Sequence, residues 1–441
     1  MSILICSSEP VPTSVAKALP GDKSISHRVL LIAAATDGES RLRGINLCGA
    51  VFPLIEALRQ LGATVDIDDG EMRVGTIDRN LRTAPVLNLG PSSAAARLLL
   101  GLLVGLGVEA VIDGDETLRP RPVDWVVEPL RGLGAELEYL RAEGQLPVRI
   151  GRSRLREGIA HLTVGSAQAR SAVLLAAWAA GVAVDVRQAI HSRDHTQRLL
   201  CSLGCRLDVR SNGVSLTPAA PPSFPFYEVP LDPSAVAYPV AAHLFRGMVE
   251  PLRIDGVCLN PTRTGFFETL RDCGIAVSYS GIVDRFGEPV GSLTVEGDWD
   301  ADSLEVDNPD RFHAMIDEIP LAAAVATRLP GLSRFGGAEE LIFKESNRIE
   351  STAAMLRAFG AEVATAADGF TVRGGVELTA SRAPSFGDHR IAMTAAALGT
   401  SLAGRTVVEQ GECTETSFPH FAETMRGYGF DVRADVSGGA A

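Results

Sequence analysis

The chain has 441 residues, of which 46% are hydrophobic and 22% charged, and its formal net charge at pH 7 is −13. This length exceeds what one hydrophobic core usually supports, so we expect two large domains. The acidic balance argues against nucleic acid or an anionic membrane as the main partner, since either would need a basic surface. The longest apolar runs, 98–108 and 172–184, are too short to span a bilayer, and no basic-then-apolar signal segment opens the chain.

The cysteines are odd in number, seven in all, and none form a CxxC motif. Cys201 and Cys205 are one helical turn apart, but no other Cys or His lies near them in sequence to complete a zinc set. We therefore interpret them as buried or surface thiols and expect a protein of the reducing cytoplasm.

One short pattern recurs six times: an amphipathic stretch, an apolar residue, a glycine and an alternating apolar run. The copies span 54–65, 127–137, 196–207, 266–277, 354–363 and 421–432, with glycines at 62, 134, 204, 274, 360 and 429. The spacing predicts a helix with one buried face, a left-handed glycine cap and a strand. Any α/β protein contains a few such junctions by chance. Six glycines 69 to 72 residues apart, with one interval of 86, instead predict six copies of one α/β unit packed on each other.

The segment LPGDKSISHR at 19–28 contains the first candidate site. A Pro-Gly turn precedes Lys23 and Ser24, and the apolar run from Val29 predicts a helix, which places both residues at a helix N-terminus. Unpaired N–H groups and the helix dipole make that position suitable for an anion. A Lys-Ser pair there is also an ordinary capping arrangement, and the GxxxxGK[ST] spacing of a Walker loop is absent.

Two further clusters are Lys344–Arg348 (KESNR) and Gly387–Arg390 (GDHR). On a helix Lys344 and Arg348 would share one face while Glu345 points to a neighbouring one. Two like charges on one face repel unless an anion or a carboxylate lies between them. Taken alone, KESNR is also typical of a solvated helix surface.

A fourth signal is Ser166–Ser171 (SAQARS), followed after an apolar run by His191–His195 (HSRDH). Hydroxyls, an amide and an arginine at turn-to-helix junctions suit hydrogen bonding to a phosphate monoester. Plain N-capping by Ser192 is the competing interpretation.

Together these segments resemble the enolpyruvyl transferases over nearly the whole chain. The motifs occur in that family's order: PGDKSISHR, the Arg121-Pro122 pair, SAQARSAVLLA, SRDHT, NPTRTG, IDEIP, GAEELIFKESNRI, GDHRIAM and TSFPHF. The resemblance implies a two-domain, inside-out α/β barrel with three α/β units in each half. It places one half at 21–233 and the other at 1–20 plus 234–441, facing each other across a cleft that closes on the substrates.

The implied reaction transfers the enolpyruvyl group of phosphoenolpyruvate to a hydroxyl of a phosphorylated alcohol and releases phosphate through a tetrahedral intermediate. By resemblance, Asp317 accepts a proton from that hydroxyl, Glu345 serves C3, and Lys23 lies near the bridging oxygen. The donor-binding residues are Lys23, Arg121, Gln168, Arg348 and Arg390; those for the acceptor are Ser24, Arg28, Ser166, Gln168, Ser192, Arg193, Asp317 and Lys344. His389 is assigned to the Arg390 turn. No metal or organic cofactor is expected, and we expect a monomer.

The donor side of the chain departs from that family at two places. Where a Gly-Asn-(Ala/Ser)-Gly-Thr segment is usual, the chain has Gly90–Ala94 (GPSSA), so Pro91 lacks a backbone N–H and Ser93 replaces a glycine. Gly49-Ala50 stands where an acidic pair is usual. The acceptor-phosphate residues are intact.

Three functions agree with this pattern. The favoured one uses the 5-hydroxyl of shikimate 3-phosphate as acceptor. The second transfers enolpyruvate to another acceptor, such as a nucleoside monophosphate in secondary metabolism. The third is a non-catalytic binder of phosphorylated ligands, which Asp317 and Glu345 argue against, because binding alone needs neither proton-transfer carboxylate.

Overall fold

The computed structural model describes the chain except residues 1, 12–17, 189–191, 220–222, 249 and 436–441. Contacts within the chain divide it into two compact units. Unit 1 comprises 1–20, 231–283 and 289–441, and unit 2 comprises 21–230 together with 284–288. The sequence placed the second change of unit after residue 233; contacts place it after Pro230 and add a short segment that the sequence did not indicate.

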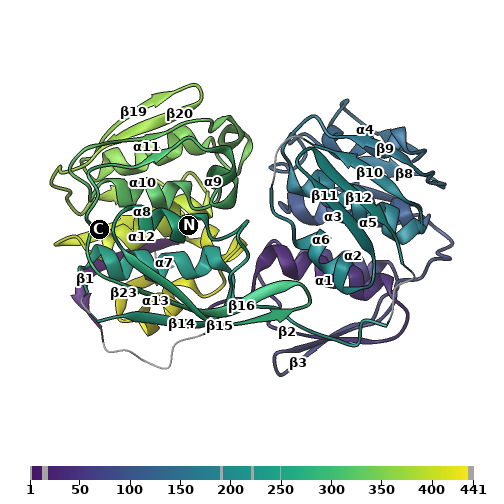
Figure 1. Cartoon of the computed structure of the whole chain (residues 1–441), viewed down its shortest axis with the longest axis horizontal. Coiled ribbons are helices and arrows are strands. Elements are labelled where there is room, and N and C mark those ends of the chain that lie inside the picture. Colours follow the sequence, from purple (N-terminus) through teal and green to yellow (C-terminus); the bar gives the residue numbers. More distant parts are fainter. Residues whose placement is uncertain (1, 12–17, 189–191, 220–222, 249, 436–441) are drawn as a thin grey trace. The chain divides into compact units, whose positions relative to one another are not determined.

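Unit 2 alternates helices and short strands (Figure 1). Its helices are α1 (Lys23–Ala35), α2 (Phe52–Gln60), α3 (Ser93–Leu106), α4 (Asp124–Gly132), α5 (Ala167–Ala180) and α6 (His195–Ser202). Its strands are β2 (Ser40–Arg43), β3 (Val65–Asp68), β4 (Glu71–Val74), β5 (Val86–Asn88), β6 (Ala110–Asp113), β7 (Leu137–Tyr139), β8 (Val148–Ile150), β9 (Gly158–His161), β10 (Val184–Arg187), β11 (Arg206–Arg210), β12 (Gly213–Thr217) and β13 (Phe226–Glu228).

Unit 1 has the same mixed composition. Its helices are α7 (Pro233–Phe245), α8 (Gly265–Asp272), α9 (Pro309–Ala314), α10 (Ile319–Ala326), α11 (Arg348–Ala358), α12 (His389–Gly399) and α13 (Phe421–Gly427), with 3₁₀ turns η1 (Glu339–Phe343) and η2 (Gly411–Thr416). Its strands are β1 (Ile3–Pro10), β14 (Leu252–Cys258), β15 (Ala276–Arg285), β16 (Glu288–Glu296), β17 (Glu305–Val306), β18 (Leu332–Phe335), β19 (Glu362–Ala366), β20 (Gly369–Arg373), β21 (Arg382–Ala383), β22 (Arg405–Val408) and β23 (Phe430–Asp435).

The strands of the described residues form six sheets. The orders are β13-β2-β4-β3, β5-β6-β8-β7 and β9-β10-β12-β11 in unit 2, and β14-β16-β15, β17-β18-β20-β19 and β21-β22-β1-β23 in unit 1. Each four-stranded sheet has one parallel pair followed by two antiparallel pairs. Two sheets pair strands that lie far apart in the sequence. In unit 2 the last strand, β13, pairs with the first, β2, and in unit 1 the first strand, β1, pairs with β22 near the C-terminus.

The predicted helix–glycine–strand junctions are confirmed at all six positions. Each glycine follows one of the helices α2, α4, α6, α8, α11 and α13, and its φ angle lies between 86° and 99°. That backbone conformation is readily available only to glycine, which ends the helix and turns the chain into the next strand. The chain therefore has a mixed α/β fold.

Buried helices form the interior of each unit. All residues of α7, α10 and α12 are buried in unit 1, and these helices contact one another. In unit 2 α3 packs closely on α5, and Gly101 and Gly105 of α3 permit this approach. A Cβ atom at Gly101 would lie 2.3 Å from the Ala172 carbonyl oxygen, and one at Gly105 would lie 2.2 Å from that of Ala176. No helix in the described part of the chain is long and apolar enough to cross a membrane.

The segment Asp284–Glu288, which comprises the end of β15, the following turn and the first residue of β16, belongs to unit 2 by its contacts. The Phe286 ring lies 4.9 Å from the ring of Tyr227, centroid to centroid. Glu288 Oε1 lies 2.8 Å from His195 Nδ1, and both side chains are fully buried. The chain therefore passes between the units at four points along its sequence, after residues 20, 230, 283 and 288.

Candidate functional site

The N-terminus of α1 carries the first candidate residues, as expected, but the helix begins earlier than its apolar run. Lys23 is the first helical residue, whereas the sequence analysis began the helix at Val29. Asp22 caps it, since its Oδ1 accepts a hydrogen bond of 2.8 Å from the Ile25 N–H. Lys23 and Ser24 are half-buried in this first turn, where N–H groups and the helix dipole favour anions.

Arg28 lies one turn further along α1 and is buried. Its guanidinium donates to Thr196 Oγ1 at 2.7 Å, to Ser171 Oγ at 2.8 Å and to the Ser24 carbonyl at 2.8 Å. Burial lowers the pKa of Arg28 to about 10, and the positive charges of Arg193 and Arg170 add to this shift against the opposing Asp22 and Glu288. Arg28 thus links α1 to α5 and α6 and lies among other arginines.

Arg170 on α5 supports the turn that carries Ser192 and Arg193. Its Nη2 donates to the carbonyl oxygens of both residues, at 2.7 and 2.8 Å. Burial lowers the pKa of Arg170 to about 10. The competing interpretation, in which Ser192 caps α6, is wrong, because the N-cap residue is Asp194. The buried Ser192 hydroxyl has no hydrogen-bond partner among the described residues, and His191 lies outside them.

The remaining candidates of unit 2 are connected by Arg97 of α3. Its Nη1 donates to Gln168 Oε1 at 2.7 Å, and its Nη2 donates to the Pro122 carbonyl, next to Arg121. The Ser166 hydroxyl caps α5 by accepting from the Ala169 N–H at 3.3 Å. Arg97 therefore brings the Arg121 loop and Gln168 together.

The segment that departs from the family pattern forms the start of α3. Ser93 is the first helical residue, and Ser92 is the N-cap. The Ser93 N–H donates to the Pro91 carbonyl at 3.1 Å. Pro91 therefore lies in the turn just before the helix, and the serine that replaces glycine lies in its first turn.

In unit 1 the KESNR segment is not helical throughout, contrary to expectation. Lys344 follows η1 in an extended conformation, and α11 begins only at Arg348. Asn347 is the N-cap, and its Oδ1 accepts hydrogen bonds from the N–H groups of Ile349 at 3.2 Å and Glu350 at 3.4 Å. Lys344 Nζ bonds Glu340 Oε1 at 2.6 Å. The two positive charges thus do not share a helix face, and each has its own carboxylate partners.

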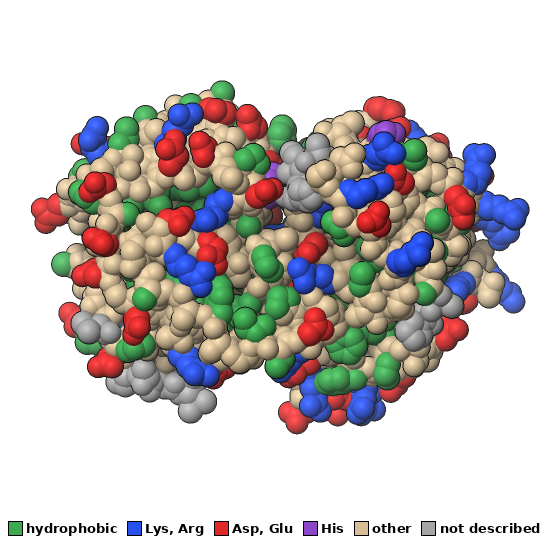
Figure 2. Space-filling model, in the orientation of Figure 1, with side chains coloured by type: hydrophobic (Ala, Val, Ile, Leu, Met, Phe, Trp, Pro, Cys, Tyr) green, Lys and Arg blue, Asp and Glu red, His purple; other side chains and the backbone are tan. Residues whose placement is uncertain are grey.

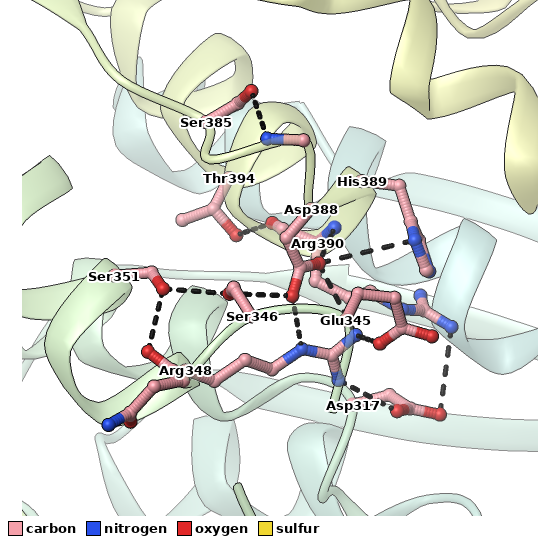
Figure 3. A network of polar contacts seen from close by, with 12 residues as sticks. Asp317, Glu345, Ser346, Arg348, Ser351, Ser385, Asp388, His389, Arg390 and Thr394 are labelled. Carbon is pink, nitrogen blue, oxygen red and sulfur yellow. Dashed lines mark hydrogen bonds and ion pairs between the residues drawn. The ribbon is translucent and has the colours of Figure 1, made fainter. Parts of the chain in front are cut away.

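Arg348 lies at the centre of a network of carboxylates (Figure 3). Its guanidinium donates to Asp388 Oδ2 at 2.8 Å, to Asp317 Oδ1 at 3.1 Å and to Glu345 Oε2 at 2.6 Å. Burial alone lowers the pKa of Arg348, but the three carboxylates raise it above its ordinary value. Arg348 and Asp388 are fully buried, whereas the Asp317 and Glu345 side chains are 19% and 30% exposed.

Arg390 follows the N-cap of α12, where Asp388 Oδ1 accepts from its backbone N–H at 2.9 Å. Its Nη2 lies 3.6 Å from Asp317 Oδ2, so Asp317 lies against two arginines. Burial lowers the pKa of Arg390, but Tyr238, Asp317, Glu318 and Asp232 raise it above the ordinary value. The buried Nε of Arg390 has no hydrogen-bond partner among the described residues.

His389 lies in this same turn, buried, with its Nδ1 4.0 Å from Asp388 Oδ1. Sequence reasoning did not select Asp388 as a site residue, although the GDHR motif contains it. It also missed Glu340 and Tyr238.

Among the described residues no group of three or more His, Cys, Asp or Glu side chains is arranged to hold a metal ion. Acidic and basic side chains are mixed over the visible surface (Figure 2).

Fold and site together define a mixed α/β protein with an arginine-rich cluster in one unit and an arginine–carboxylate network in the other. A family model described as EPSP synthase (3-phosphoshikimate 1-carboxyvinyltransferase) matches residues 8–425. The chain belongs to this family.

Individual relatives agree with the family model. The 3-phosphoshikimate 1-carboxyvinyltransferase of Herpetosiphon aurantiacus is 36% identical over 408 residues, covering 91% of this chain and 94% of the relative. That of Granulibacter bethesdensis is 37% identical over 425 residues, covering 94% and 93%. Among solved structures, the EPSP synthase of Acinetobacter baumannii superimposes with a TM-score of 0.85 at 27% identity, covering 99% of this chain and 100% of that one.

Proposed function

We propose that this protein is an enzyme that transfers the enolpyruvyl group of phosphoenolpyruvate to the 5-hydroxyl of shikimate 3-phosphate and releases phosphate. The relatives named above are 3-phosphoshikimate 1-carboxyvinyltransferases and match over nearly the whole chain. The protein is therefore a transferase of the shikimate pathway, which supplies aromatic amino acids.

The observation that carries this proposal is the convergence of Asp317 and Glu345 on the single guanidinium of Arg348. Both carboxylates are partly exposed while their common partner is buried, so a substrate can reach them without disturbing it. Enolpyruvyl transfer needs two positioned proton-transfer groups, one at the acceptor hydroxyl and one at the methylene carbon. Arg348 holds two such groups in fixed positions.

In the first step the acceptor hydroxyl oxygen bonds to C2 of phosphoenolpyruvate, its proton goes to Asp317, and Glu345 delivers a proton to C3. In the second step the C2–O bond to phosphate breaks, and Glu345 takes a proton back from C3 to restore the double bond. Lys23, at the N-terminus of α1, stabilises the bridging oxygen as phosphate leaves. The departing phosphate takes up the proton held by Asp317, so atoms and charges balance without an oxidant or a reductant.

The phosphates and carboxylates of the substrates require positive charge. On the donor, Arg121, Gln168, Arg348 and Arg390 would act with Lys23, and the unpaired Nε of Arg390 is one donor ready for a ligand. On the acceptor, Ser24, Arg28, Ser166, Gln168, Ser192, Arg193 and Lys344 would act with Asp317. Burial is the main cause that lowers the pKa values of Arg28 and Arg170, and at Arg28 the positive charges of Arg193 and Arg170 add to it; a bound phosphate would offset that repulsion at Arg28.

An assay of phosphate release with phosphoenolpyruvate and a panel of acceptors tests the proposal. Shikimate 3-phosphate should give the highest kcat/KM. Nucleoside monophosphates, the acceptors of the alternative function, should give no turnover above that of phosphoenolpyruvate alone, and nothing in the comparisons favours them. Phosphate release with none of these acceptors would show that the protein is not this transferase.

The proposal extends to architecture and setting. We propose that each unit comprises three α/β modules arranged as an inside-out barrel, supported by the buried helices and by the six glycine junctions. The protein would work as a cytoplasmic monomer without a metal or organic cofactor. Seven cysteines that form no disulfide suit a reducing compartment, and light scattering would measure the mass in solution.

A further inference from the structure

The imidazole of His27 joins three separate segments of unit 2. His27 lies on α1, one turn after Lys23, and its side chain is fully buried. Its Nδ1 lies 2.8 Å from the Lys23 carbonyl oxygen. Its Nε2 lies 3.1 Å from the Ala50 carbonyl oxygen and 3.2 Å from Ser92 Oγ. One ring therefore contacts the first turn of α1, the turn before α2 and the N-cap of α3.

The protonation of this ring follows from its surroundings. Burial, together with the charges of Lys23 and Arg28, lowers the pKa of His27 to about 4, and the two carbonyl groups oppose this shift. The ring is therefore neutral at neutral pH and has one N–H for two nitrogens. We assign this proton to Nδ1, because the Lys23 carbonyl is the closer acceptor.

With this tautomer, Nε2 accepts a hydrogen bond from the Ser92 hydroxyl. Ser92 Oγ in turn accepts from the Ala95 N–H of α3 at 3.4 Å, in its role as N-cap. A continuous hydrogen-bond chain thus runs from the N-terminus of α3 through Ser92 and His27 to the Lys23 backbone. The links through Ser92 are buried and the link to Lys23 is partly buried, so breaking one of the Ser92 links leaves an unpaired polar group away from water.

Two of the three segments joined by His27 are those on which the donor side departs from its family, and the third carries Lys23. Ala50 belongs to the Gly49-Ala50 turn that replaces an acidic pair, and Ser92 lies between Pro91 and Ser93. Pro91 removes a backbone N–H from the 90–94 segment, and the 49–50 turn lacks two acidic side chains. The His27 ring lies against both segments, because its Nε2 accepts from the Ser92 hydroxyl and lies 3.1 Å from the Ala50 carbonyl oxygen.

We propose that His27 is a positioning residue for phosphoenolpyruvate, which holds Lys23 and the turn at the start of α3 in a fixed mutual arrangement. This inference rests on the proposed function. The hydrogen bonds of Arg28 to Thr196 and Ser171 do not involve the His27 ring. Loss of the ring should therefore weaken donor binding and leave acceptor binding nearly unchanged.

Two substitutions test the contacts of the two ring nitrogens separately. His27→Asn places an amide nitrogen near the Nδ1 position and keeps the bond to Lys23, while His27→Gln reaches toward Ser92 and loses that bond. Losing one buried neutral hydrogen bond corresponds to a ~10-fold rise in the KM for phosphoenolpyruvate. Both variants should show this rise, with less than a twofold change in the KM for shikimate 3-phosphate. Ser92→Ala should act in the same direction, and combining it with His27→Asn should add little, because both break one link.

His243→Gln is the matched control, because His243 is a buried histidine of α7 in unit 1. It should leave both KM values unchanged. Equal rises in both KM values for His27→Asn, or an unchanged KM for phosphoenolpyruvate, would overturn the inference. If neither His27 variant folds, Ser92→Ala decides between these outcomes on its own. Turnover by the unmodified protein is measured first, so that failure of the proposed function is recognised separately.

Discussion

The arginines of the two units lie in opposite electrostatic surroundings. In unit 1, Arg348 and Arg390 lie against carboxylates that raise their pKa above the ordinary value, despite burial. In unit 2, burial and neighbouring arginines lower the pKa of Arg28 to about 10, and burial lowers that of Arg170 to a similar value. The same residue type is thus surrounded by carboxylates that outweigh burial in one unit, and lies where burial outweighs the nearby carboxylates in the other.

This difference indicates distinct tasks. The unit 1 network is complete without a ligand, so it can hold Asp317 and Glu345 in place before a substrate arrives. The unit 2 cluster combines crowded arginines with the unpartnered Ser192 hydroxyl, so it gains most when an anion binds. The two proton-transfer carboxylates are therefore held in unit 1, whereas the unit 2 cluster serves anion binding alone.

The largest effect should come from Glu345→Gln, which removes proton transfer while keeping the size of the side chain. We expect kcat to fall about 10²–10⁴-fold, with shikimate 3-phosphate affinity within about twofold of the unmodified protein. Phosphate release and calorimetric titration measure the two quantities. Glu350→Gln, on the exposed side of α11, is the control. Turnover above a tenth of the original would exclude the role given to Glu345.

Asp388→Asn tests whether the unit 1 network is balanced by its own charges. Asp388 is a fully buried partner of Arg348, accepts from Ser346 and caps α12, so its loss leaves a buried guanidinium with one carboxylate fewer. We expect the free energy of unfolding to fall by about 3–5 kcal/mol. Chemical denaturation measures it, with the exposed Asp310→Asn as reference. A loss below 1 kcal/mol would show that the network is not held by this pair.

The neutral His27 of unit 2 makes stability depend on pH. Its pKa is about 4 in the folded protein and 6.5 when exposed, so the unfolded chain binds more protons between these values. Stability is therefore complete above pH 6.5 and is lost as the pH falls toward 4, by about 3 kcal/mol from this group. Denaturation curves of the unmodified protein and His27→Asn should converge at low pH. Parallel curves would mean that folding does not lower the pKa of His27.

Ser192→Ala tests the anion site of unit 2. A hydrogen bond from a hydroxyl to a charged phosphate contributes about 1.5–3 kcal/mol, so shikimate 3-phosphate should bind roughly 10- to 150-fold more weakly. Ser202→Ala, at the end of α6, provides a comparison outside the cluster. Equal affinity in both variants would place the acceptor phosphate elsewhere.

The smallest expected effect concerns Ser93 at the start of α3. By the resemblance of the sequence to enolpyruvyl transferases, glyphosate binds in the phosphoenolpyruvate pocket and is longer than phosphoenolpyruvate. A side chain where glycine is usual should exclude glyphosate by about 1–3 kcal/mol, and Ser93→Gly should restore part of its affinity. Inhibition of both proteins is measured side by side. Tight inhibition of the unmodified enzyme would contradict this placement of the loop.

Local patterns predicted much of the fold because helix ends are determined by nearby residues. The six glycine junctions were found this way. Two helix starts were missed although their signals were present. Asp22 precedes α1 as an N-cap, and Asn347 is followed three residues later by Glu350, the spacing of a capping box. Reading these caps would have placed Lys23 inside the helix and Lys344 outside one.

Long-range partners could not be predicted in the same way. Asp388 lies 40 residues beyond Arg348 in sequence, and Glu288 lies 93 residues beyond His195. Neither pair shares a helix or a turn, so no periodicity relates its members. The resemblance to the family predicted Asp317, Glu345 and Arg348 as site residues. That both carboxylates bind the guanidinium of Arg348 is seen only in the structure.

The segment Asp284–Glu288 has a consequence for how the protein is made on the ribosome. Unit 2 has nearly all of its residues once position 230 is synthesised, yet His195 lacks its buried carboxylate partner until Glu288 emerges. Unit 1 waits longer, because β1 at the start of the chain pairs with β22 and β23 near its end. An N-terminal segment must therefore remain without its sheet while some 400 residues are added, a period in which an unpaired strand is exposed to aggregation.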